Sequence, residues 1–345
     1  QANARVTFDN SSFNLGSELT LAQGTFNLQD SVTLTASAPG GSLALGSTNG
    51  AATLNISSAL INAFQTQGSK GKIKLTNAST LNLTGDSVVE LGQTGASFDD
   101  TAVKIEGPKF AATSALTGSS GLELTGTEFE LNFAGASDAI NKVALSGAMS
   151  VAGGAQLTIN ELTFSSSSTP STDPALTVTS TDSSTMLTIG TLDLASRALV
   201  AQGTASTAPA VVALTPNTKS RSTGNITGDL IALQNAIIGV GATNTELASF
   251  YTQHQDQASA MVYLKQALSL RADQQLIADN SSTNYTTSQT SAGSNSIYLG
   301  EKSALAVDLN AFTGNQAAIH IQKADASVQG QQQSKIIIVD GSSST

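Results

Sequence analysis

The sequence predicts an all-β fold of the solenoid class, in which short strands stack on one another along the chain. Three observations lead to this prediction. A short apolar–polar–apolar triplet recurs at close spacing, turn-forming residues separate the triplets, and small and β-branched side chains are abundant enough to fill a packed core. Only 12% of the 345 residues are charged and 39% are hydrophobic, which differs from the charge-rich composition of disordered chains.

The stretch between Arg5 and Ala36 carries the clearest triplets. They are Val6-Thr7-Phe8, Phe13-Asn14-Leu15, Leu19-Thr20-Leu21, Phe26-Asn27-Leu28 and Val32-Thr33-Leu34. Alternation at period two places both apolar side chains of a triplet on one face of a strand. Successive triplets start six or seven residues apart, which leaves no room for a helix between them. Strands of about three residues lie at the short limit of the usual range, so we expect stacking to stabilise them.

Triplets of the same kind continue to residue 194 and resume after residue 295. Further examples are Leu43-Ala44-Leu45, Leu54-Asn55-Ile56, Leu81-Asn82-Leu83, Val103-Lys104-Ile105, Leu122-Glu123-Leu124, Leu157-Thr158-Ile159, Leu187-Thr188-Ile189 and Ile297-Tyr298-Leu299. The middle residue is usually polar and is expected to face solvent. Turn-formers such as Gly40-Gly41 and Gly153-Gly154 lie between triplets. Two or three strands with their corners predict about 20 to 25 residues per coil.

One segment departs from period two and predicts a helical insertion near residues 228–276. Asp229–Ile238 is typical of a short helix that ends at Gly239, and Thr243 with Glu246 matches a capping box. An apolar stripe at helical spacing follows. It comprises Leu247, Phe250, Tyr251, His254, Ala258, Met261, Leu264, Lys265 and Leu268. The sequence therefore predicts solenoid coils over 1–225, a helical hairpin over 226–280 and further coils over 281–345.

The predicted hairpin supplies the candidate partner-binding residues, which are Phe250, Tyr251, His254 and Tyr263. Insertions in repeat proteins often gather on a binding face, so these side chains are candidates for specificity. The alternative is that the hairpin only covers an edge of the stack or caps it.

Charge and composition exclude several classes of partner. The net charge is -10 and no cluster of Lys or Arg occurs, so we expect no nucleic-acid binding. The chain has no cysteine, which excludes disulfides and thiolate metal sites. No run approaches the roughly 20 apolar residues that a membrane-spanning helix needs, so direct membrane insertion is not expected.

We expect no enzymatic activity, no cofactor and no metal. His254 and His320 lie in unrelated contexts, which does not favour a joint role in a metal or catalytic site. Asp99, Asp100, Asp173, Asp182 and Asp193 are expected at solvated positions. A polysaccharide-degrading site would need acids from different coils to come together.

The chain resembles the passenger region of bacterial type V autotransporters. Phrases such as Ser79–Gly85 and Ile297–Val307 carry the resemblance, which extends over most of residues 5–200 and 295–340. The resemblance implies a right-handed parallel β-helix, export through the outer membrane of a Gram-negative bacterium and a cell-surface or extracellular location. It implies no active site that can be transferred residue by residue. We expect residues 1–345 to be a fragment whose targeting segments lie elsewhere.

The function that the resemblance implies is adhesion to host cells or matrix, with a host surface protein or glycan as the partner. An outward ladder of Thr, Asn, Ser, Asp and Glu would offer many weak contacts that add up through multivalency. Self-association with another copy, as a biofilm module, would use the same ladder. A secreted toxin passenger, a polysaccharide-degrading β-helix enzyme and a trimeric phage fibre are further alternatives.

Overall fold

The computed structural model of the chain describes about two thirds of its residues. These are residues 4–37, 41–48, 50–66, 72–85, 87–91, 97–98, 103–107, 109–112, 116, 121–132, 137–165, 174–194, 198–214, 224–227, 230–265, 268–269, 275–278, 296–299, 302–308 and 335–339. The chain forms two compact units, residues 1–167 and 168–345. Each unit is described by itself.

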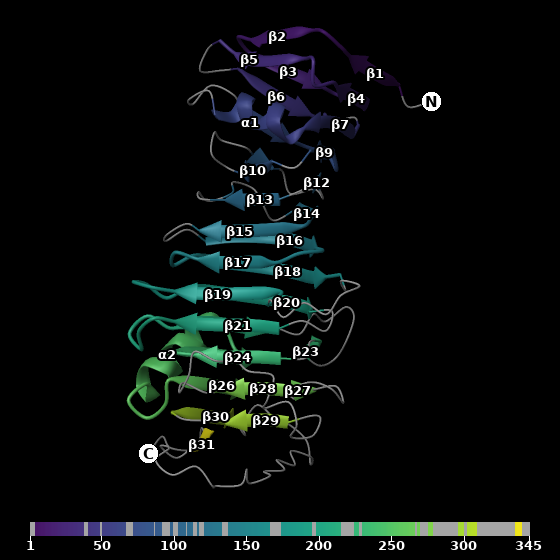
Figure 1. Cartoon of the computed structure of the whole chain (residues 1–345). Helices are drawn as coiled ribbons and strands as arrows, with labels where there is room; N and C mark the ends of the chain where they lie inside the picture. The colour runs from purple at the N-terminus through teal and green to yellow at the C-terminus, as the bar shows by residue number, and fades with distance from the viewer. Residues whose placement is uncertain are drawn as a thin grey trace. The chain divides into compact units, whose positions relative to one another are not determined.

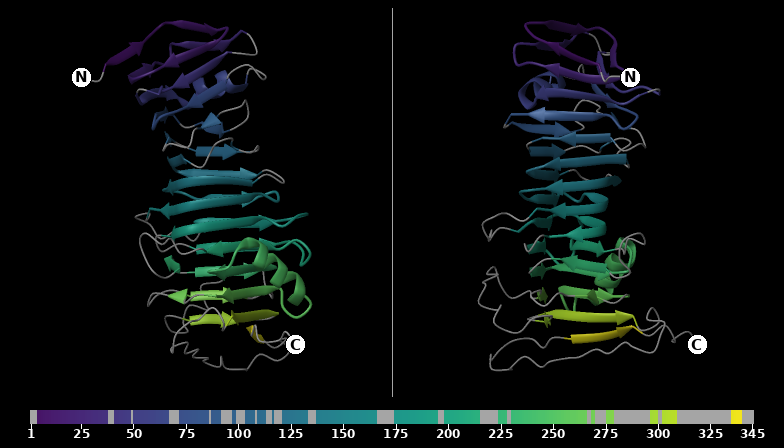
Figure 2. Two further views of the ribbon diagram at one scale, coloured as in Figure 1. Left: turned by 180° about the vertical axis from the view of Figure 1, so that it is seen from behind. Right: turned by 90° about the vertical axis from the view of Figure 1, so that its right-hand side faces the viewer.

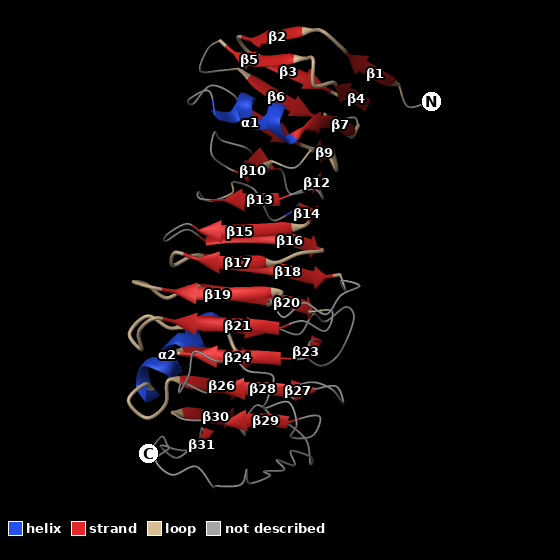
Figure 3. Cartoon of the chain, viewed as in Figure 1, coloured by secondary structure: helices blue, strands red, loops and turns tan. Residues whose placement is uncertain are grey.

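The described residues are mostly β-strand, with parallel sheets and two helices (Figure 3). In each unit the parallel strands lie one above another (Figure 1). Among the described strands no sheet closes on itself. The predicted all-β class with stacked parallel strands is confirmed at this level.

Unit 1 contains one long sheet and three smaller groups of strands. The long sheet has the order β1 (Arg5–Phe8), β4 (Gly24–Leu28), β7 (Ala52–Ser57), β9 (Thr80–Thr84), β12 (Val103–Glu106), β14 (Leu122–Gly126), β16 (Ser137–Leu145) and β18 (Gln156–Phe164). A second sheet has β10 (Val88–Leu91), β13 (Lys109–Ala112), β15 (Glu128–Asn132) and β17 (Met149–Ala152). The remaining strands are β3 (Glu18–Leu21), β6 (Ser42–Leu45), β8 (Lys72–Leu75) and β11 (Ser97–Phe98) in one group, and β2 (Ser12–Leu15) with β5 (Thr33–Ala36) in another.

The apolar positions of the triplets stack in register to form the core of unit 1. One column runs through Leu54, Leu81, Ile105, Leu124, Val143 and Leu162, each at most 1% exposed. The chain thus returns to the same column with each successive strand of this sheet. Full burial of each such side chain contributes about 1.5–3 kcal/mol, so the column accounts for much of the stability of these short strands.

Helix α1 (Ser58–Thr66) of unit 1 was not predicted from the sequence. It follows directly on β7 and packs against β5 and β10. Ile61 and Phe64, three residues apart, are fully buried on one side of it, and the Ser57 hydroxyl accepts a hydrogen bond from the Leu60 N–H at 3.2 Å. Ser57 and this three-residue apolar spacing are the signals that could have predicted the helix.

Unit 2 repeats the arrangement with a long sheet and a second sheet. The long sheet has the order β20 (Met186–Asp193), β22 (Ala210–Leu214), β25 (Ala236–Val240), β26 (Ala260–Leu264), β30 (Ser303–Asp308) and β31 (Lys335–Val339). The second has β19 (Leu176–Ser180), β21 (Ala198–Gly203), β24 (Leu230–Gln234), β28 (Gln275–Ala278) and β29 (Ser296–Leu299). Two short strands, β23 (Gly224–Thr227) and β27 (Leu268–Ser269), pair with each other.

The predicted helical hairpin is wrong in its first half. Residues 230–240 form β24 and β25, which meet at Asn235 in the left-handed conformation with φ 43°. All five residues of β25 are buried, and its backbone pairs in parallel with β22 and β26. An apolar run buried on both faces cannot be distinguished from a buried helix by periodicity alone, and the two β-branched Ile residues favour the strand.

In the second half of the predicted hairpin, only the start of the helix is confirmed. Helix α2 (Asn244–His254) begins with the predicted capping box, in which Thr243 Oγ1 accepts from the Glu246 N–H at 3.2 Å and Glu246 Oε2 accepts from the Thr243 N–H at 2.8 Å. The helix ends at His254, and Met261 lies in strand β26. Figure 2 shows α2 lying against the strands of unit 2. Neither described helix is long and apolar enough to cross a membrane.

A candidate binding face

The outward face of the long sheet in unit 1 carries polar side chains in straight columns. Register places Thr25, Thr53 and Thr80 in one column. Asn27, Asn55 and Asn82, two residues further along the same strands, form the next column on the same face. Adjacent strands are about 4.8 Å apart, so β4, β7 and β9 present a regular array of hydroxyl and amide groups.

The Asn column is held in place by a directed chain of hydrogen bonds. Asn82 Nδ2 donates to Asn55 Oδ1 at 2.9 Å, and Asn55 Nδ2 donates to Asn27 Oδ1 at 2.7 Å. Asn27 Nδ2 donates to Thr7 Oγ1 at 3.1 Å. Each bond contributes about 1 kcal/mol net and fixes the amide plane, so these side chains are ordered before any partner arrives.

The three Thr hydroxyls beside the Asn column remain available for contacts. Thr25, Thr53 and Thr80 are half-buried, and within the described residues their side-chain oxygens have no protein hydrogen-bond partner. Each hydroxyl can both donate and accept. The column therefore offers three hydroxyl groups that can bond to water or to a bound molecule.

Further along the same face the outward residues are charged and alternate in sign. Lys104, Glu123, Lys142 and Glu161 pair in register on β12, β14, β16 and β18. Lys142 Nζ lies 2.8 Å from Glu161 Oε1, and Lys104 Nζ lies 3.9 Å from Glu123 Oε2. The hydrogen bond to Glu161 raises the pKa of Lys142, partial burial opposes this, and the negative charges of Glu161 and Glu123 add to the rise.

This charged column was not recognised in the sequence, although a signal for it is present. Residues 104, 123, 142 and 161 are evenly spaced in the sequence, and the charge changes sign at every step. A search for charges at the coil period, in addition to apolar triplets, would have predicted it.

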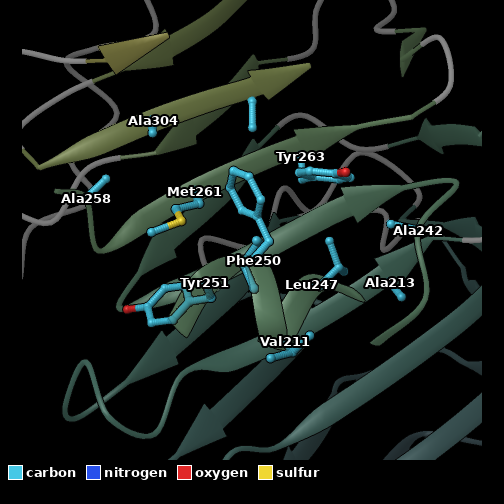
Figure 4. Packing of buried hydrophobic residues seen from close by; sticks show 12 residues of the cluster. Val211, Ala213, Ala242, Leu247, Phe250, Tyr251, Ala258, Met261, Tyr263 and Ala304 are labelled. Carbon is cyan, nitrogen blue, oxygen red and sulfur yellow. The ribbon is translucent and has the colours of Figure 1, made fainter. Parts of the chain in front are cut away.

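The predicted partner-binding residues of α2 lie mainly inside unit 2. Phe250, Tyr251 and Tyr263 are 9%, 0% and 7% exposed, and they belong to a cluster that fills the space between α2 and the strands (Figure 4). The Phe250 ring stacks on His254 at 4.1 Å between centroids and contacts Tyr263 at 4.8 Å. The structure thus brings Phe250, His254 and Tyr263 together. Of the four, only His254 is more than marginally exposed.

Tyr251 points away from that group and serves the packing of α2. Its hydroxyl donates to the Ser259 carbonyl oxygen at 3.2 Å, and burial raises the pKa of the phenol well above its usual range. The exposed side of α2 carries Ser249, Thr252 and Gln253 instead.

The outward face of the long sheet in unit 2 is apolar where α2 covers it. Ala213, Gly239, Tyr263 and Ala306 are in register there, at positions that carry Thr, Asn, Lys or Glu in unit 1. A Cβ at Gly239 would lie 2.3 Å from Leu247 Cδ2, so glycine lets the helix pack closely on β25. The candidate binding face therefore belongs to unit 1, where the described helix leaves the polar columns uncovered.

The remaining titratable candidates do not gather into a site. Asp182 and Asp193 are exposed on unit 2, while Asp99, Asp100, Asp173 and His320 lie outside the described residues. Among the residues that the structure describes, no group of three or more His, Asp or Glu could hold a metal ion.

Comparison of the chain with protein-family models, curated proteins and solved structures finds no significant match.

Proposed function

We propose that the chain is part of an exported autotransporter-type passenger that adheres to host cells or matrix through the polar outward face of unit 1. We infer a right-handed parallel β-helix as its architecture. In-register parallel pairing and the return of the chain to the same column in coil after coil support this inference. The proposed location is the cell surface or the extracellular medium.

The observation that carries the proposal is the Thr and Asn array on β4, β7 and β9. The Asn amides are already fixed by their own hydrogen bonds, so binding there costs little side-chain entropy. The neighbouring hydroxyls repeat at every strand and are free to donate and accept. A host surface glycan or an extended protein segment, which presents repeated polar groups, is the class of partner that fits this array.

The burial of Phe250, Tyr251 and Tyr263 argues that α2 is a cover and not the contact surface. Aromatic side chains that anchor a partner have to be reachable from solvent. In this proposal α2 covers the apolar outward face of the strands of unit 2.

We further propose that the chain binds and does not catalyse. Self-association with another copy is the second candidate function, because the alternating charges on β12 to β18 favour it. No observation on the described residues specifically favours a toxin, a phage fibre or a polysaccharide-degrading enzyme.

The proposal is tested by removing the three hydroxyls without changing side-chain shape. The variant Thr25→Val, Thr53→Val, Thr80→Val is compared with the wild type in saturation binding to mammalian cells. Because each net hydrogen bond contributes about 1 kcal/mol, we expect binding to weaken by at least about tenfold.

The matched control replaces three outward Thr residues elsewhere, Thr158→Val, Thr177→Val and Thr179→Val, and should bind as the wild type does. Equal binding by all three proteins, or no saturable binding by the wild type, would contradict the proposal.

A further inference from the structure

The charged column on β12, β14, β16 and β18 has a property that single ion pairs lack. Read along the stack, the outward charges of Lys104, Glu123, Lys142 and Glu161 are positive, negative, positive and negative. Reversing the order of the strands exchanges every positive position with a negative one. The column is therefore complementary in charge to a reversed copy of itself.

A two-fold axis brings such a reversed copy face to face with the first. If the axis lies in the plane of the face, runs parallel to the strands and passes between β14 and β16, then β12 of one copy faces β18 of the other. Lys104 then faces Glu161 of the second copy, and Glu123 faces its Lys142. Position along the strand is unchanged by this rotation, so the two columns stay aligned.

The opposite arrangement fails on the same residues. With the strand order kept, Lys104 would face a second Lys104 and Glu123 a second Glu123, and like charges placed opposite each other are unfavourable.

We propose that this column is a self-docking surface through which two copies of the chain associate as an antiparallel, two-fold symmetric pair. Isologous contacts of this kind are the commonest mode of association between identical chains. The inference does not depend on the adhesion proposed above, because it uses strands β12 to β18 and not the Thr and Asn array on β4 to β9.

The charged side chains are accessible and form a network. Lys104 and Lys142 are 50% and 38% exposed, and Glu123 and Glu161 are 23% and 42% exposed. Within one chain Lys142 already lies between two acidic neighbours, and docking would add a carboxylate from the second copy. Networks of charges contribute more than isolated surface pairs do.

The neighbouring column permits close approach. Thr125 and Ala144 lie two residues beyond Glu123 and Lys142 on the same face, and the two-fold axis would set Thr125 of one copy opposite Ala144 of the other. The same rotation would set Glu106, the member of this column on β12, opposite Thr163 on β18, so no like charges meet in it. The small side chains of Thr125 and Ala144 leave the longer Lys and Glu side chains to make the contacts.

The charged column covers a small area, so the association of two copies should be weak and sensitive to salt. The four strands extend over only about 15 Å along the stack, so the area that the column can bury is well below the roughly 800 Å² per partner of a standard stable interface. We expect self-association at high protein concentration and low ionic strength, with a loss on adding salt because exposed charges are screened.

The test inverts the column as a whole. The variant K104E/E123K/K142E/E161K keeps every ion pair within the chain and remains complementary to a reversed copy of itself. It should self-associate like the wild type in sedimentation at low salt. It should not associate with the wild type, because the antiparallel arrangement would then set Lys opposite Lys and Glu opposite Glu. Capture of labelled variant by immobilised wild type measures this directly.

A second variant and a control complete the design. K104E/K142E makes the column wholly acidic and should lower the association constant by about tenfold or more, with thermal melting to verify that it is folded. The swap K109E/E128K inverts a comparable exposed ion pair on the second sheet, where Lys109 Nζ lies 3.1 Å from Glu128 Oε2, and should leave association unchanged.

Three results would overturn the proposal. The wild type could be monomeric at every concentration and salt, in which case the column acts only within one chain. The wild type could capture the inverted variant as well as it captures itself, which would show that the charges of the column do not determine the pairing. The folded acidic variant could associate as strongly as the wild type, which would exclude the column as the contact.

Discussion

At the scale of single residues, the face on which each triplet position lies decides whether its side chain is buried in the core or turned outward. Leu81 is 1% exposed and lies in the core column between Leu54 and Ile105. Asn82, the next residue, is half-buried on the outward face and donates to Asn55. Neighbouring residues of one strand thus have opposite environments, and substitutions there separate core burial from surface contacts.

Leu81→Asp should destabilise unit 1 by several kcal/mol, because it places an unpaired carboxylate in a continuous apolar column. Asn82→Ala should cost only about 1 kcal/mol, the value of one amide hydrogen bond. Melting temperatures of the two variants check this. Equal losses in both would refute the assignment of faces.

Tyr251 provides a prediction about pH. Its pKa is raised by burial, so the protonated phenol stabilises the folded chain. That contribution is fully present below the usual Tyr pKa of about 10 and is lost as the pH rises from there toward the folded-state value.

Tyr251→Phe removes the hydrogen bond to Ser259 and should cost about 1 kcal/mol at neutral pH. The phenylalanine has no phenol to ionise, so the difference between variant and wild type should shrink above about pH 10. Urea denaturation of both proteins at neutral pH and above about pH 10 measures the two free energies of unfolding. If the free energy of unfolding fell by the same amount in both proteins when the pH is raised, the assigned role of Tyr251 would be contradicted.

At the scale of elements, helix α2 explains why the sequence prediction succeeded only in part. Its start was predictable because a capping box is a local pattern, and Lys265 Nζ adds an ion pair to Glu246 at 2.8 Å. Hydrogen bonds from Lys265 and the Thr243 backbone hold the pKa of Glu246 below its usual range. Its end was not predictable, because the apolar residues after His254 face the core as strand β26 with the same composition that a helical stripe would have.

The sequence pattern predicts Gly239 as the end of a helix, whereas in the structure Gly239 lies in strand β25 and packs against Leu247. Gly239→Ala should destabilise unit 2 by about 1–3 kcal/mol, since the added methyl group overlaps the buried Leu247 side chain. Gly16→Ala is a suitable control, because its Cβ would meet only Ser37 Oγ at 3.6 Å.

A double-mutant cycle makes the Gly239 prediction specific. In Gly239→Ala with Leu247→Ala the overlap is gone, so the combined loss should be smaller than the sum of the two single losses. Additive losses in chemical denaturation would show that Gly239 does not act through Leu247.

At the scale of the whole molecule, the stacked parallel strands could be predicted from the sequence, because the two apolar residues of each triplet identify the buried face of that strand. The sequence did not predict the charged column on unit 1, because the triplet pattern describes one strand at a time, whereas the charges repeat at even spacing from one strand of the sheet to the next. It also assigned Phe250, Tyr251 and Tyr263 to a binding surface, because a stripe of aromatic residues has the same spacing whether it faces a partner or its own sheet.

Point variants are therefore better suited than deletions for locating the binding surface. Removing residues 226–280 would delete strands β24, β25, β26, β27 and β28 together with α2. A loss of binding after that deletion would report unfolding of unit 2, whereas single outward substitutions leave the strands paired.

The most direct test of the central claim, that in-register stacking joins distant residues into one outward face, is zero-length carbodiimide cross-linking of the dilute wild-type chain. The reaction links a Lys amine to a carboxylate only where the two are in contact. We predict an isopeptide bond between Lys142 and Glu161, because Lys142 Nζ lies 2.8 Å from Glu161 Oε1. We predict another between Lys109 and Glu128, because Lys109 Nζ lies 3.1 Å from Glu128 Oε2. Mass spectrometry of the cleaved chain identifies both. Bonds from Lys142 to out-of-register acids such as Glu106 or Glu130, with none to Glu161, would contradict the account.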